Sequence, residues 1–95
     1  MKVYISIPIS GHDYDTQKAE ADRMKETLIE CGYEAITPFD VAPEKDKPYS
    51  YYMGRDIEAL LECDAVYFCQ GHEHSKGCRL EYAAAITYDK TIMNY

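Results

Sequence analysis

The chain has 95 residues, a formal net charge of −7 and 46% apolar residues. This length accommodates one small domain over residues 1–95, and the apolar content excludes a disordered chain. Basic residues are scattered and outnumbered 10 to 17 by acidic ones, which argues against a nucleic-acid polymer as partner, and no apolar run is long enough to cross a membrane.

Apolar periodicity predicts strands and helices in alternation along the chain. Asp13, Asp15 or Thr16 can cap the first helix, and Gly32 suits the left-handed residue that follows it. We expect strands at 2–7, 33–37, 65–69 and 91–95 and helices at 16–31, 51–62 and 77–88. Residues 39–49 are expected to form a long surface loop, and loops of that length are often functional.

This alternation predicts an α/β fold with a parallel four-stranded sheet between helices on both faces, a three-layer α/β/α sandwich. Right-handed crossovers favour the strand order 2-1-3-4. In open sheets of this kind, ligands bind beyond the carboxyl ends of the strands, where the chain reverses direction. The loops at residues 8–13 and 70–76 meet at that point, so we expect the site there.

The sequence begins Met-Lys-Val-Tyr-Ile-Ser-Ile-Pro, without the apolar run of a signal peptide, so we expect a cytoplasmic protein with free thiols. Cys69, His72, His74 and Cys78 are close enough in sequence to be weighed as zinc ligands. Their spacing lacks the tight pairs of zinc sites, and Cys69 closes a run typical of a buried strand. We therefore favour two structural cysteines and two loop histidines, and expect no metal and no cofactor.

The first candidate for chemistry at this site is Glu81, a carboxylate about one turn into the third helix. Ser75 and Gly77 lie at the start of that helix, where free backbone N–H groups bind anions or hydroxyls. A carboxylate that faces a cleft near a helix N-terminus stays ionised and can act as a nucleophile. Alternatively, Glu81 is a favourable first-turn charge that faces water.

Other residues allow two interpretations each. Asp56, on the second helix, is either a candidate acid or a solvated residue that pairs with Arg55 or Lys47. The apolar side of that helix is expected to bury Met53, Ile57, Leu60 and Leu61. The tyrosines 49, 51 and 52 either wall a pocket for a flat base or pack against the sheet or a second subunit.

Three segments stand out together: Val-Tyr-Ile-Ser-Ile-Pro-Ile-Ser-Gly at 3–11, Tyr-Met-Gly-Arg-Asp-Ile at 52–57, and Ser75-x-Gly77-x-x-x-Glu81. In their order and spacing they resemble the nucleoside 2-deoxyribosyltransferase superfamily, and the resemblance spans nearly the whole chain. The resemblance implies a flavodoxin-like or Rossmann-like sheet and enzymes that break or exchange the N-glycosidic bond of 2-deoxyribonucleosides or their 5'-monophosphates.

The family's functional residues fall on matching positions of this sequence. The nucleophilic glutamate falls on Glu81, which would form a covalent deoxyribosyl intermediate that water or a second base resolves with retention. The aspartate that handles the proton of the leaving base falls on Asp56. Ser75 falls where the 5' side of the sugar is held, and a serine there resembles the monophosphate-hydrolysing branch. The substrate-binding positions implied by the family or by placement are Tyr4, Ser10, Gly11, Ser75, Gly77 and Arg79.

The sequence departs from the family pattern at two positions. Ile7 stands where glycine is usual, and its side chain could fill the space against which the base or sugar lies. Arg79 replaces a small residue, and it could pair with a phosphate or block the site.

These observations leave three interpretations. The chain is an N-glycosidase or deoxyribosyltransferase acting on a small nucleoside or nucleotide, a non-catalytic nucleotide-binding module of the same fold, or a structural domain without an open cleft. The enzyme requires Glu81 and Asp56 to converge on one cleft. Separately, the small core and the many tyrosines predict a homo-oligomer.

Overall fold

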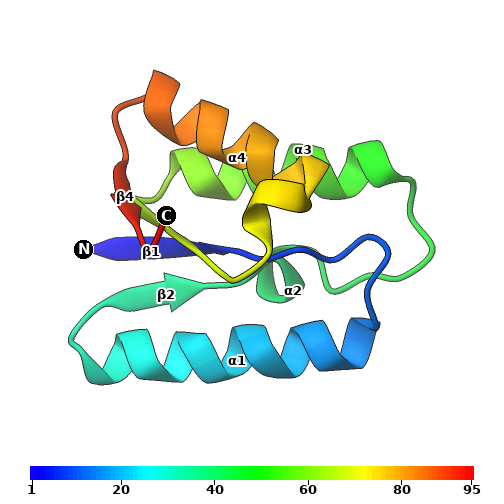
Figure 1. The fold of residues 1–95 in the computed structure, drawn as a ribbon, viewed down its shortest axis with the longest axis horizontal. Coiled ribbons are helices and arrows are strands. Elements are labelled where there is room, and N and C mark those ends of the chain that lie inside the picture. The colour runs from blue at the N-terminus through cyan, green and yellow to red at the C-terminus, as the bar shows by residue number, and fades with distance from the viewer.

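The computed structural model describes residues 1–95 and shows a sheet flanked by helices (Figure 1). The strands are β1 (Lys2–Ser6), β2 (Glu34–Ile36), β3 (Ala65–Phe68) and β4 (Thr91–Met93). The helices are α1 (Tyr14–Glu30), α2 (Pro38–Val41), α3 (Tyr49–Leu61) and α4 (Lys76–Thr87), with a 3-10 turn η1 (His72–His74). None of the helices has the length and apolar character needed to cross a bilayer.

The sheet is parallel throughout and its strand order is β2-β1-β3-β4, which confirms the predicted α/β topology. Val3 of β1 lies opposite Ala35 of β2 and Ala65 of β3, and Tyr67 of β3 lies opposite Met93 of β4. The direction of the chain reverses between β1 and β3, so their carboxyl ends border one common edge.

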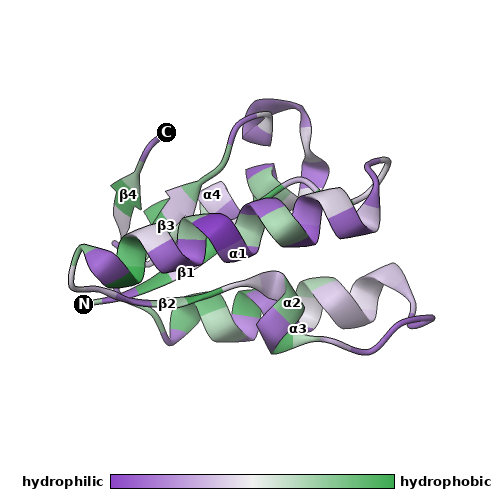
Figure 2. Cartoon of the chain, turned by 90° about the horizontal axis from the view of Figure 1, so that it is seen from below, coloured by the Kyte–Doolittle hydropathy of each residue, from purple (hydrophilic) through white to green (hydrophobic).

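The two faces of the sheet are covered by different helices, and the strands lie between them as a largely apolar layer (Figures 1 and 2). Residues that alternate along β1 divide between these faces. Val3, Ile5 and Ile7 pack against α1, in a cluster that includes Ala21 and Leu28. Tyr4 faces the opposite side, in a cluster with residues of α3, β3 and α4. This alternation directs Tyr4 and Ser6 toward α4.

The prediction of a surface loop at 39–49 is wrong for its first residues. Pro38–Val41 form the short helix α2, and Phe39 and Ala42 are buried. The Thr37 side chain accepts the Asp40 N–H, while Asp40 accepts the Thr37 N–H, which completes a capping box with proline at the first helical position. The exposed loop is therefore only residues 43–48.

The boundaries of the other elements follow local chemistry. The Asp13 side chain caps α1 by accepting the Thr16 N–H at 2.9 Å, as one of the predicted caps, and Gly32 has the expected positive φ of 95°. The prediction that the second helix buries Leu61 is wrong, because Leu61 is 37% exposed. Asp56 is buried one turn before Leu60 instead, so α3 turns a carboxylate toward the interior.

Candidate active site

A cavity of about 750 Å³ opens at the carboxyl edge of β1, β2 and β3. Ligand pockets in proteins usually measure roughly 300–1,000 Å³. Its wall is built from the segments that follow the three strands and from the first half of α3. The residues that line it are Ile7, Ile9, Ser10, Tyr14, Pro38, Phe39, Ala42, Glu44, Lys45, Asp46, Lys47, Tyr49, Tyr52, Met53, Asp56, His74, Ser75, Lys76, Gly77, Cys78 and Glu81.

Glu81 lies in this wall and is only 3% exposed. Ser6 Oγ donates a hydrogen bond to Glu81 Oε1 at 2.6 Å, and the Tyr4 hydroxyl donates to Oε2 at 2.8 Å. Both donors come from β1, two residues apart, and therefore point to the same face of the sheet. Glu81 is thus a buried carboxylate with a donor on each oxygen, and the alternative of a first-turn charge in water is wrong.

Asp56 reaches the same cavity from α3 and is 6% exposed. The interpretation of Asp56 as a solvated residue that pairs with Arg55 or Lys47 is wrong, because Asp56 is buried and ion-paired to neither; Arg55 pairs with Glu58 at 3.2 Å. Asp56 Oδ1 is buried and has no hydrogen-bond partner. An orphaned carboxyl oxygen in a buried site favours the protonated acid, which needs less solvation than the anion.

Burial controls the protonation of both carboxyls. It raises the pKa of Asp56 to about 7, and the nearby Tyr4 hydroxyl opposes this in part. It raises the pKa of Glu81 to about 8; the Ser6 and Tyr4 hydrogen bonds oppose this, and negative charge on Asp56 adds to it. Burial and both carboxyls hold the pKa of Tyr4 well above its usual value, so Tyr4 remains a donor. The pair therefore retains one proton near neutral pH.

The other predicted site residues divide into two groups. Ser10, Ser75 and Gly77 line the cavity with the two carboxyls, and Tyr4 lies beneath Glu81. Gly11 and Arg79 are exposed and lie outside the lining. Arg79 therefore does not narrow this space.

Two of these lining residues shape the start of α4. The Ser75 side chain caps α4 by accepting the Cys78 N–H at 3.2 Å. A Cβ at Gly77 would lie 3.3 Å from Met53 Sδ and 3.4 Å from the Tyr49 hydroxyl, so this glycine keeps the α3 and α4 walls close together.

The Ile7 side chain does not fill the space near Glu81, as its position in the family pattern suggested it could. It is 5% exposed and packs with Val3, Ile5 and Phe39 in the cluster beneath α1. Side-chain alternation along the strand places it on the opposite face from Ser6 and Glu81. Ile7 borders the cavity, but the cavity remains open.

Aromatic side chains form much of the cavity wall. Tyr49 and Tyr52 line it, as one of the two interpretations of the tyrosine cluster predicts, whereas Tyr51 lies outside the lining and packs edge to face against Tyr52. Tyr14 and Phe39 line it as well, with their rings edge to face at 5.1 Å. The sequence predicted neither Tyr14 nor Phe39 in the site. Tyr14 begins α1, two residues before the expected helix start, and Phe39 lies on α2, whose signal was the Thr-Pro-Phe-Asp capping sequence at 37–40.

Basic groups stand among these lining residues. Lys45, Lys47, Lys76 and His74 all line the cavity, and none of the three lysines forms an ion pair. Lys45 Nζ lies 4.6 Å from the centre of the Tyr14 ring. Glu44 and Asp46 line the same wall, but neither is ion-paired to these lysines, which are therefore available to a ligand with an anionic part.

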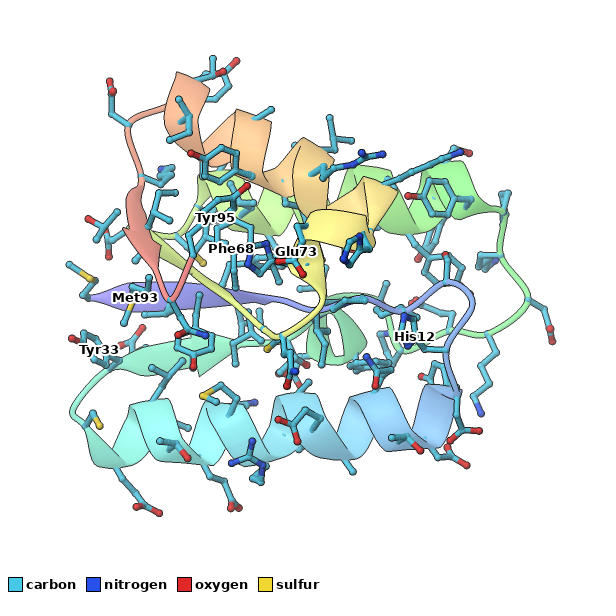
Figure 3. The ribbon with its side chains drawn as sticks, in the orientation of Figure 1. His12, Tyr33, Phe68, Glu73, Met93 and Tyr95 are labelled. Carbon is cyan, nitrogen blue, oxygen red and sulfur yellow. The ribbon has the colours of Figure 1, made fainter.

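The segment between β3 and α4 is held by aromatic packing. The Tyr95 ring lies beside Phe68 (Figure 3), with 5.3 Å between ring centres, and it stacks on Tyr82 at 4.1 Å. His72 of η1 also packs against Tyr95 at 4.5 Å. These contacts fix the turn that leads into Ser75.

The four residues weighed as zinc ligands do not converge. No three His, Cys, Asp or Glu side chains are grouped so that they could hold a metal ion. Cys69 and Cys78 are buried, and His72 is buried in η1 rather than lying in an open loop. Burial also raises the pKa of both thiols, so they are protonated at neutral pH.

No curated protein matches the sequence. Among solved structures, the chain resembles a 2-deoxyribosyltransferase from the psychrotolerant bacterium Bacillus psychrosaccharolyticus, with a TM-score of 0.73, 16% identity, and coverage of 97% of this chain and 69% of that one. It also resembles the Clostridium botulinum CMP N-glycosidase, with a TM-score of 0.62, 19% identity, and coverage of 97% and 68%. These likenesses show a shared fold. The model of the family described as a domain of unknown function (DUF4406) matches residues 1–94, and the chain therefore belongs to that family.

Proposed function

We propose that this protein cleaves, or transfers the sugar at, the N-glycosidic bond of a 2-deoxyribonucleoside or its 5'-monophosphate. The observation that carries the proposal is the convergence of Glu81 and Asp56 on one open cavity, with both carboxyls buried. The structures with the same fold include a 2-deoxyribosyltransferase and a CMP N-glycosidase, and their activities support this class of reaction.

The two carboxyls differ in a way that suits two roles. Glu81 accepts two hydrogen bonds, which stabilise its ionised form, while Asp56 has an oxygen without a partner. The pair retains one proton near neutral pH, and the reactive form is the one in which this proton lies on Asp56. This leaves Glu81 as the anionic nucleophile and Asp56 as the acid.

The reaction then proceeds in two balanced steps. A Glu81 carboxylate oxygen attacks the anomeric carbon while the bond to the base breaks, and Asp56 gives its proton to the departing nitrogen. Asp56, now ionised, takes a proton from water or from a second base, whose oxygen or nitrogen displaces Glu81 from the anomeric carbon. Two inversions at that carbon give net retention.

The wall of the cavity offers matching surfaces for the parts of such a substrate. The rings of Tyr14, Phe39, Tyr49 and Tyr52 suit a flat base. Ser75 and Lys76 stand at the start of α4 and suit the 5' side of the sugar or its phosphate. Ser10 is proposed as a further polar contact to the substrate.

The placements of Ile7 and Arg79 favour the enzyme over the binding module. The binding module requires one of them to obstruct the space near Glu81. Arg79 is exposed outside the cavity lining, and Ile7 packs beneath α1.

Base release tests the proposal directly. The parent protein and its Glu81→Ala variant are incubated with a panel of deoxynucleosides and their 5'-monophosphates, with and without a second base, and free base is followed by chromatography. We expect release by the parent and none by the variant. Release that survives Glu81→Ala would exclude Glu81 as nucleophile, and no release from any panel member would favour the binding module.

A further inference from the structure

We propose that Ser6 is a positioning residue that fixes Glu81 Oε1 and thereby sets the orientation and ionisation of the carboxylate. The catalytic part of this inference rests on the proposed function, whereas the ionisation part does not. Ser6 was not among the residues singled out in the sequence, and it lies outside the cavity lining. Its effect on a substrate must therefore pass through Glu81.

The position of Ser6 follows from the sheet. It is the last residue of β1, is fully buried, and pairs in register with Phe68 of β3. Because Ser6 is fully buried and its backbone is paired with β3, the Ser6 side chain has little freedom. Its hydroxyl lies 2.6 Å from Glu81 Oε1, at the edge of the sheet where the cavity opens.

Ser6 and Tyr4 together hold the plane of the Glu81 carboxylate. Tyr4 alone would bind Oε2 and leave the group free to rotate about its last side-chain bond. With Ser6 on Oε1, any such rotation breaks a buried hydrogen bond, which is costly in a dry site. Each oxygen can accept more than one hydrogen bond, so a lone pair remains for attack.

The proton of the Ser6 hydroxyl is available for this bond. Burial raises the pKa of the neighbouring Cys78 thiol, so the thiol is neutral and does not compete as an anion for the Ser6 proton. The Ser6 proton is therefore available for Glu81 Oε1. The Ser6 hydroxyl also stabilises Glu81 as the leaving group in the second step, when the carboxylate re-forms.

The ionisation part can be tested without any activity. Protein with 13C-labelled glutamate side chains is titrated by NMR, and the Glu81 signal is assigned with Glu81→Gln. The variants are Ser6→Ala, which removes the donor, and Ser6→Cys, which keeps the size and weakens the donor. Ser50→Ala is the control, because Ser50 is exposed on α3 and outside the cavity lining.

We expect Ser6→Ala to raise the pKa of Glu81 by about one pH unit, because the ionised form loses a donor. Ser6→Cys should give a smaller rise, and Ser50→Ala none. An unchanged Glu81 titration in Ser6→Ala would overturn the proposal. If Ser6→Ala does not fold, the same criterion applies to Ser6→Cys.

The catalytic part of the proposal is tested by steady-state kinetics of Ser6→Ala with the best substrate of the panel. Ser6→Ala should lower kcat about tenfold without raising KM, and shift the acid limb of the pH profile upward with the Glu81 titration. A raised KM with unchanged kcat would contradict positioning through Glu81. If the parent releases no base, the proposed function fails, while the titration still decides whether Ser6 controls the carboxylate.

Discussion

Asp56 and Glu81 belong to different helices, α3 and α4, yet negative charge on Asp56 raises the pKa of Glu81 across a shared cavity. Two isolated surface carboxylates would both be ionised at neutral pH. Here burial is the largest cause of the raised pKa at each residue, so the pair shares a proton in that range. The arrangement supplies an acid and a nucleophile from two side chains of the same chemical type.

Replacement of Asp56 should act through the leaving group. Asp56→Asn removes the proton donor, so we expect base release from a deoxynucleoside to fall roughly 100-fold or more. A 4-nitrophenyl 2-deoxyriboside has a weakly basic leaving group that departs without protonation, and its cleavage should fall far less. Steady-state rates on both substrates check this. An equal loss on both would mean that Asp56 does not protonate the base.

The activity of the parent should depend on pH in a bell shape. Below about pH 7 both carboxyls carry protons and Glu81 cannot attack; above about pH 8 both are ionised and Asp56 has no proton to give. We therefore expect a maximum between these values. In Asp56→Asn, the alkaline limb should disappear from the residual activity, because the group whose ionisation causes it is gone. A profile that is flat from pH 5 to 9 would contradict this assignment.

The free energy of unfolding should also depend on pH through the buried Glu81 carboxyl. Glu81 has a usual pKa of 4.5 and a pKa of about 8 in the fold. Between these values the folded state binds a proton that the unfolded state lacks, so the free energy of unfolding falls as pH rises. Glu81→Gln removes this loss.

The comparison of the two proteins isolates Glu81. The advantage of Glu81→Gln should be small near pH 4.5 and grow to about 4 kcal/mol near pH 8. Urea unfolding of both proteins at several pH values measures it. A stability difference that stays constant across this range would show that Glu81 titrates normally in the fold.

The elements were predictable from the sequence because the apolar runs, the Asp13 cap and Gly32 mark them clearly, and the preference for right-handed crossovers then led to the sheet order. It missed α2 because the helix spans only residues 38–41, too short to show a repeating apolar pattern. Its physical signal was the capping box formed by Thr37 and Asp40. The omission concealed how Phe39 reaches the cavity.

The candidate site was predictable in part. Glu81 and Asp56 came from the family resemblance, and their convergence depends on how α3 and α4 pack, which no local pattern determines. The burial of Asp56 in place of Leu61 breaks the usual rule that apolar residues face the interior. Ser6 was predictable in principle, since it alternates with Tyr4 on one face of β1.

The measurement that tests the central claim most directly is the stereochemistry of sugar transfer to methanol. The parent is run in aqueous methanol with the best deoxynucleoside or monophosphate, and NMR identifies the methyl glycoside, whose configuration is stable. Attack by Glu81 followed by methanol inverts the anomeric carbon twice, so a β-nucleoside should give the β-methyl glycoside, and Glu81→Gln should give none. Formation of the α-methyl glycoside would mean direct displacement by the solvent and would contradict a glycosyl–Glu81 intermediate.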